Sequence, residues 1–191
     1  MRDLIFYPVF ILVVLGAIGL AMLPGERSHR PTSQNITLEG YVLAGEDMQR
    51  LTQAPGTLMT FETDSKGKVL YAVMSANLPK KLAPPSAGVF DVLNPPYEQA
   101  FAGRDLKITI TARAGQQNPL EKFQTAYFSS DTTSGWQVFT LTPDFEDYVF
   151  TFTPPAKTGV LGAEYIGIWP GIEGRMKTVE IQNMKIEIIK P

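Results

Sequence analysis

Residues 106–113 read LKITITAR, and apolar and polar side chains alternate along the whole stretch. Leu106, Ile108, Ile110 and Ala112 fall on one side of the alternation, and the lysine, the threonines and the arginine fall on the other. Successive side chains of a β-strand point to opposite faces, so this pattern indicates a strand with one buried and one solvated face. We therefore expect the chain to build its core from strands.

The same period of two recurs on both sides of this stretch. Tyr148 to Phe152, Tyr165 to Trp169 and Val179 to Ile188 alternate in this way, with an irregularity near Asn183 that a one-residue bulge would explain. Further candidate strands run from Ile36 to Leu43, Leu58 to Thr63, Lys68 to Ser75, Gly88 to Val92, Phe123 to Ser129 and Trp136 to Leu141. The total is about ten short strands, a number typical of a sandwich.

Turn signals separate these strands. The segment Asp64-Ser65-Lys66-Gly67 predicts a hairpin turn, and prolines within 79–85, 95–96 and 154–155 predict loops or sheet edges. Only Glu46 to Gln53 resembles a short helix. Many short strands favour a mainly β fold, a β-sandwich or jelly roll, over a parallel sheet with crossover helices. We expect one such domain over residues 36–191.

The chain begins with an apolar run. Residues 4–23 are twenty residues without a charged side chain. At about 1.5 Å per helical residue they would span roughly 30 Å, one bilayer core. We expect a transmembrane helix over residues 1–23 and a polar linker over residues 24–35, which would hold the β domain within about 40 Å of the membrane. A cleaved signal peptide is the alternative, with Gly19-Leu20-Ala21 as its cleavage site.

Few charges flank this run. Arg2 precedes it, and Arg27 and Arg30 follow it. The positive-inside rule counts such residues near the helix ends, and the count here weakly favours a cytoplasmic β domain. Anchored β-sandwiches of this kind are nevertheless usually exported. We therefore expect a single-pass protein of the bacterial inner membrane, held in the lipid bilayer by its helix, with its C-terminal domain in the periplasm.

Composition limits the possible functions. Lys and Arg total 17 against 19 Asp and Glu, without a long basic stripe, so nucleic-acid binding is not expected. The sequence has no cysteine, and its single histidine, His29, lies in the predicted linker. Asp144, Glu146 and Asp147 are the one acidic group that suggests glycoside hydrolysis, but they occupy a turn that contains Pro143. We expect no enzymatic activity.

Several segments occur in an order that resembles a known family. They are Gly88-Val89-Phe90, Phe101-Ala102-Gly103-Arg104 before the strand at 106–113, Gly135-Trp136-Gln137, the strand at 148–152, Tyr165-Ile166-Gly167-Ile168-Trp169 and Val179-Glu180-Ile181. From about Leu38 to Ile189 the chain resembles galactose-binding-like jelly rolls, a fold group that includes many carbohydrate-binding modules. The resemblance implies a non-catalytic domain that binds glycans.

A glycan-binding surface needs an exposed aromatic ring against which a sugar can lie. Because Ile166 and Ile168 are expected to point inward, the alternation turns Tyr165 and Trp169 outward on one face. These two residues are the predicted aromatic platform, and Trp136 is a further candidate at a strand entrance. The alternative is that these rings pack in the core or beneath a loop.

The sugar hydroxyls require polar partners. Arg113, Glu62 and Gln137, on strands expected to be neighbours, are the candidates. The resemblance also raises the question of a structural calcium ion, often held by an acidic residue near the start of the last strand. Asn183 stands where that carboxylate would be sought, which weakens the case because calcium favours carboxylate oxygens. We expect no metal and no cofactor.

Two functions remain open. The broader one is an accessory subunit of a membrane-protein assembly, in which the helix docks against an integral-membrane protein partner. Gly16, Ala17, Gly19 and Ala21 are small residues that would permit close helix contact. The alternative is an envelope glycan-binding module with a polysaccharide as its ligand. We take the accessory subunit as the main hypothesis from the sequence.

Overall fold

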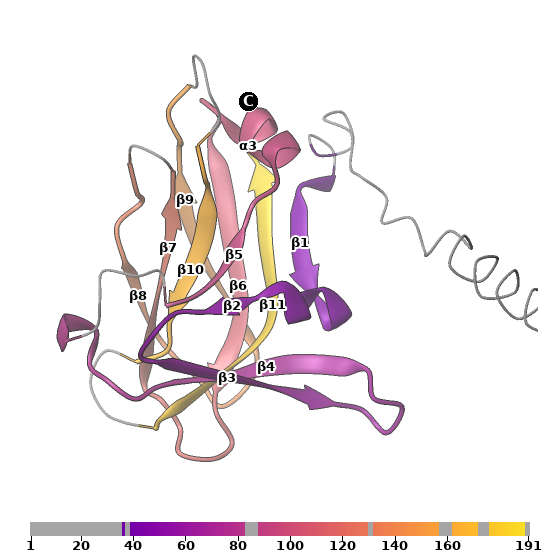
Figure 1. The fold of residues 1–191 in the computed structure, drawn as a ribbon, viewed down its shortest axis with the longest axis vertical. Helices are drawn as coiled ribbons and strands as arrows, with labels where there is room; N and C mark the ends of the chain where they lie inside the picture. The colour runs from indigo at the N-terminus through magenta and orange to yellow at the C-terminus, as the bar shows by residue number, and fades with distance from the viewer. Residues whose placement is uncertain are drawn as a thin grey trace, which may run out of the picture. The chain divides into compact units, whose positions relative to one another are not determined.

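Two antiparallel sheets make up the fold. A computed structural model of the chain describes residue 36 and residues 39–82, 88–129, 132–156, 162–171 and 176–189. Within these residues one sheet has six strands and the other has five. The sheets pack in a sandwich-like arrangement, which confirms the predicted mainly β fold (Figure 1). The predicted anchor and linker, residues 1–23 and 24–35, lie outside the described residues.

The six-stranded sheet is built around its last strand. Its strands are β1 (Tyr41–Ala44), β3 (Thr57–Thr63), β4 (Val69–Ala76), β6 (Leu106–Ala114), β9 (Glu146–Phe152) and β11 (Thr178–Ile188). The order is β3-β4-β11-β6-β9, and β1 also pairs with β11. The pairing of β11 with β6 shifts by one residue between Ile181 and Asn183, so the predicted bulge is confirmed. Before the shift β11 pairs with β4, and after it with β1.

The five-stranded sheet is centred on β10. Its strands are β2 (Thr52–Gln53), β5 (Val89–Val92), β7 (Lys122–Phe128), β8 (Gln137–Thr140) and β10 (Tyr165–Trp169), in the order β2-β5-β10-β7-β8. In Figure 1 the β3–β4 hairpin of the other sheet lies crosswise in the lower part of the view, while β7 and β10 run upright. Strand β1 begins at Tyr41, five residues later than the predicted start at Ile36.

Three short helices lie wholly within the described residues. They are η1 (Gly45–Arg50), η2 (Lys80–Leu82) and α3 (Pro95–Phe101). The predicted helix from Glu46 to Gln53 is a single 3-10 segment that ends at Arg50, because Thr52 and Gln53 pair with β5 instead. The loop predicted at Pro95-Pro96 is wrong: both prolines open α3, where a missing N–H costs nothing. Among the described residues no helix is long and apolar enough to cross a membrane.

The core lies between the two sheets. Leu106, Ile108, Ile110 and Ala112 are fully buried, as the alternation in LKITITAR predicts. The five-stranded sheet contributes another group of buried side chains to the same cluster, namely Val89, Phe123, Tyr127, Ile166 and Ile168. Since the core fixes the inward side of each strand, the remaining side chains of the five-stranded sheet face away from the core.

Candidate functional site

Aromatic side chains gather on the outward face of the five-stranded sheet. Ile166 and Ile168 of β10 belong to the core, so Tyr165 points to the opposite side, as predicted. The sheet register pairs Tyr165 with Phe128 of β7 on one side and with Val92 of β5 on the other. Val92 is 45% exposed, which shows that this face meets solvent.

Four rings form a continuous line across this face. Tyr165 stacks on Phe128 with ring centroids 4.7 Å apart and planes 16° apart, and it contacts Phe90 of β5 at 5.7 Å. Phe128 in turn meets the edge of Trp136 at 5.4 Å. We call Phe90, Tyr165, Phe128 and Trp136 the aromatic row. Each ring is partly exposed, so the row offers solvent an apolar strip that crosses strands from β5 to the start of β8.

A lysine from another part of the chain lies on the end of the aromatic row. The Nζ atom of Lys80, in η2, sits 3.8 Å from the centroid of the Trp136 ring. The attraction is a cation–π contact, in which the negative face of the ring faces the ammonium. Burial lowers the pKa of Lys80 to about 8. The row therefore has a positively charged group at one end.

Trp169 differs from its prediction. It lies on the outward side of β10, but its side chain is 0% exposed, so the prediction of an exposed platform there is wrong. The backbone just before β5 approaches it closely: a Cβ atom at Gly88 would lie 3.2 Å from the Trp169 ring. The Nε1 atom of Trp169 and the Oε1 atom of its cross-strand neighbour Gln124 are both buried and have no hydrogen-bond partner among the described residues.

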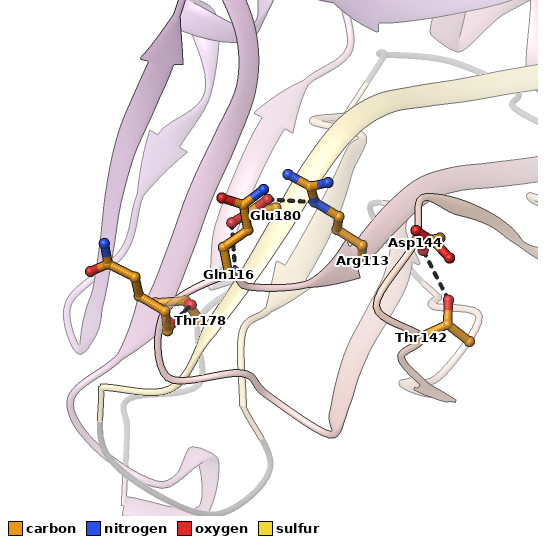
Figure 2. Close-up of polar contacts among 7 residues, drawn as sticks. Arg113, Gln116, Thr142, Asp144, Thr178 and Glu180 are labelled. Carbon is orange, nitrogen blue, oxygen red and sulfur yellow. Dashed lines mark hydrogen bonds and ion pairs between the residues drawn. The ribbon is translucent and has the colours of Figure 1, made fainter.

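Arg113 is on the other sheet and is occupied there. Its Nε donates to a Glu180 carboxylate oxygen at 2.6 Å, and the second oxygen of that carboxylate accepts the backbone N–H of Gln116 at 2.9 Å (Figure 2). The guanidinium also lies 4.3 Å from the Phe145 ring centroid and 5.3 Å from that of Tyr71. Arg113 thus joins β6 to β11, and the structure does not bring it to the aromatic row.

The other two polar candidates also lie away from the row. Glu62 is an exposed residue of β3, paired with Tyr71 in the six-stranded sheet. Gln137 lies on the same side of β8 as Phe139, and the Phe139 ring packs on the core residue Phe123. The side-chain amide of Gln137 donates to the carbonyl oxygen of Ser134 at 3.0 Å. Of the predicted site residues, Tyr165 and Trp136 come together on one partly exposed surface. Trp136 directly precedes β8, and both rings contact Phe128 of β7.

The acidic turn before β9 takes part in local hydrogen bonds. Asp147 accepts one from the Thr111 hydroxyl at 2.6 Å. The backbone carbonyl oxygen of Asp144 accepts one from the Thr142 hydroxyl at 2.9 Å (Figure 2). Over the residues that the structure describes, no three His, Cys, Asp or Glu side chains group closely enough to hold a metal ion. The side-chain oxygen of Asn183 is buried, and no described residue forms a hydrogen bond with it.

Sequence reasoning missed three members of the surface. Phe128 and Phe90 alternate with the buried Tyr127 and Val89, so the same period of two that exposed Tyr165 could have found them. Lys80 carries no such signal. It follows β4 in a short 3-10 turn, and only the tertiary structure brings it to Trp136.

Comparisons with known proteins identify the fold class. No protein-family model and no curated protein matches the chain. A solved structure described as "CBM4 structure and function" aligns with a TM-score of 0.50 and 15% identity, over 81% of this chain and 99% of that one. A tandem CBM22-1-CBM22-2 domain of Paenibacillus barcinonensis Xyn10C aligns with a TM-score of 0.50 and 8% identity, over 75% of this chain and 43% of that one.

A third similar structure is the C-terminal family 22 carbohydrate binding module of Clostridium thermocellum Xyn10B. It aligns with a TM-score of 0.49 and 12% identity, over 78% of this chain and 92% of that module. At such identities the first two likenesses define the fold, a β-sandwich of the kind found in carbohydrate-binding modules.

Proposed function

We propose that this protein is a non-catalytic polysaccharide-binding module that holds its ligand on the aromatic row. The carrying observation is the line of four partly exposed rings across the outward face of the five-stranded sheet. Sugar rings have apolar C–H faces that pack on aromatic side chains, and a row of rings suits a chain of successive sugars. Such binding requires no reactive group.

The similar folds support this reading over the accessory subunit that the sequence first favoured. The two similar structures that align with a TM-score of 0.50 are described as carbohydrate-binding modules. Gly16, Ala17, Gly19 and Ala21, the basis of that hypothesis, lie outside the described residues. Within the proposal, the N-terminal segment anchors the module in the bacterial inner membrane and its β domain faces the periplasm.

Affinity gel electrophoresis against soluble β-glucan, xylan and pectin tests the proposal. We expect retardation by at least one of them, and a loss of affinity of about tenfold in Trp136→Ala and in Tyr165→Ala, as for buried aromatic anchors elsewhere. Tyr71→Ala is the matched control, because Tyr71 is an aromatic residue of the opposite sheet. No retardation by any polysaccharide, or an equal loss in the Tyr71 variant, would contradict the proposal.

A further inference from the structure

The described strand residues on the outward face of the five-stranded sheet carry positive charge and no negative charge. Alternation and register place twelve described strand residues on it: Thr52, Phe90, Val92, Lys122, Gln124, Ala126, Phe128, Val138, Thr140, Tyr165, Gly167 and Trp169. None of these is acidic, and one is a lysine. Lys80, which reaches the same face from η2, adds a second cation. Along these described strand residues and Lys80, an anionic ligand would meet two cations and no carboxylate.

Lys80 differs from the other partly buried cations among the described residues. Arg113 pairs with Glu180 at 2.6 Å and Lys185 with Glu187 at 2.8 Å, so each of those charges has a carboxylate partner within the protein. Among the described residues Lys80 has no carboxylate partner, and its ammonium rests on the Trp136 ring alone.

This environment leaves Lys80 ready to bind an anion. Burial already strips part of the water from its ammonium, and this lowers its pKa to about 8. A partly desolvated cation gains more from an ionic hydrogen bond than a fully hydrated one does. A ligand on the aromatic row would lie beside this group, because Trp136 belongs to the row and carries Lys80 on its ring.

We propose that the polysaccharide bound by the aromatic row is an acidic one, and that the Lys80 ammonium donates to a carboxylate of its uronic acid residues. This inference rests on the proposed function and adds the class of ligand. The aromatic row supplies affinity for the sugar chain, whereas Lys80 selects chains that carry negative charge. A neutral chain binds the row without this selection.

A matched pair of ligands tests the inference. One is a uronate-bearing xylan, and the other is the same xylan after chemical reduction of its carboxyl groups to alcohols. Binding of the full-length chain in mild detergent is measured by titration calorimetry. We expect the intact xylan to bind about tenfold more tightly than the reduced one, the size expected of one charge-assisted hydrogen bond.

Variants assign the preference to Lys80. Lys80→Ala should remove the tenfold preference, Lys80→Arg should retain most of it, and Lys81→Ala, an exposed neighbour in η2, should leave it unchanged. Equal binding of the two xylans by the native protein, or an unchanged preference in Lys80→Ala, would overturn the inference. A sulfated β-glucan, run alongside, should bind more weakly than the uronate xylan; stronger binding would replace carboxylate with sulfate as the ligand group and so also overturn it.

The same titrations separate this inference from the proposed function. Trp136→Ala and Tyr165→Ala should weaken binding of both xylans, because the row contacts the sugar chain itself. If the reduced xylan binds through the row and the intact one gains nothing, the module binds polysaccharide and only the acidic preference fails. If neither xylan binds the native protein, and neither pectin nor β-glucan binds, both proposals fail.

Discussion

Two buried tyrosines make the stability of this fold depend on pH. The Tyr41 hydroxyl donates to Asp91, which also holds Arg50, and the Tyr127 hydroxyl donates to Glu164, which accepts the Ser129 hydroxyl as well. Burial, followed by the adjoining carboxylate, raises the pKa of Tyr41 and of Tyr127 far above that of a free tyrosine. Both phenols therefore stay protonated in the native state.

The consequence is a loss of stability at alkaline pH. Below about pH 10, tyrosines are protonated in the folded and the unfolded chain alike, and the hydrogen bonds contribute fully. Above it, the unfolded chain releases these two protons and the folded one does not, so the free energy of unfolding falls as pH rises. Urea denaturation at pH 8 and pH 11 measures this fall, which should be smaller in Tyr41→Phe.

Absorbance at 295 nm offers an independent check at the same residues. Of the seven tyrosines, Tyr41 and Tyr127 should contribute no tyrosinate signal until the protein unfolds. Complete ionisation of all seven in a protein that keeps its native circular dichroism would contradict the assignment.

At the level of the elements, Gly88 permits β5 to approach β10. Its φ is +73°, and a Cβ there would lie 2.2 Å from the carbonyl oxygen of Ile168. Gly67 is a matched control, because its φ is +80° but nothing lies within 4 Å of its Cβ position. We expect Gly67→Ala to cost about 1 kcal/mol from backbone strain, and Gly88→Ala to cost at least about 2 kcal/mol more from the clash. Chemical denaturation of both variants measures the difference, and equal costs would contradict the close approach.

The pair Arg113–Glu180 ties β6 to β11 in a partly buried position. Glu180→Gln removes the charge that faces the guanidinium, which is only 17% exposed, and should destabilise the protein by about 2 to 3 kcal/mol. Lys185–Glu187, at 2.8 Å, is a more exposed ion pair on the same β11 strand, with side chains that are 37% and 39% exposed. Glu187→Gln should cost less than about 1 kcal/mol. Thermal unfolding compares the two variants, and similar shifts in Tm would show that burial of the pair contributes nothing.

At the scale of the molecule, strands with a strict alternation could be read from the sequence, and their partners could not. The core side of β6 and of β10 follows from local pattern alone, and so does the bulge in β11. Arg113 and Tyr165 were grouped in one site because their strands were expected to be neighbours. They lie on different sheets, and sheet membership depends on pairing between segments far apart in the chain.

Exposure was the second property that local pattern could not supply. Trp169 and Tyr165 share the outward side of β10, yet only Tyr165 is partly exposed. Whether an outward side chain meets water depends on which other segments cover it, and alternation says nothing about that. Lys80 is a second case that local pattern does not predict: it belongs to η2, and only the tertiary structure places its ammonium on the Trp136 ring.

The location of the whole chain gives a prediction of its own. If residues 1–23 form the expected anchor, the full-length protein should sediment with membranes and resist extraction by high salt, whereas a chain without residues 4–23 should remain in the supernatant. A fusion of alkaline phosphatase to the C-terminus should be active in intact cells. An inactive fusion would contradict the periplasmic assignment, and a salt-extracted protein would contradict the anchor.

The bulge in β11 makes one position of the chain tolerant of a change in length. Gln182 is the extra residue: Ile181 and Asn183, on either side of it, pair with the consecutive residues Ala112 and Thr111 of β6. An in-frame loss of its codon would leave a regular strand in which Ile181, Met184 and Ile186 still face the core, whereas loss of a codon elsewhere in β11 would carry the later side chains to the opposite face. Substitution of this exposed glutamine should be harmless as well, so natural variation at this site is expected in both residue type and number.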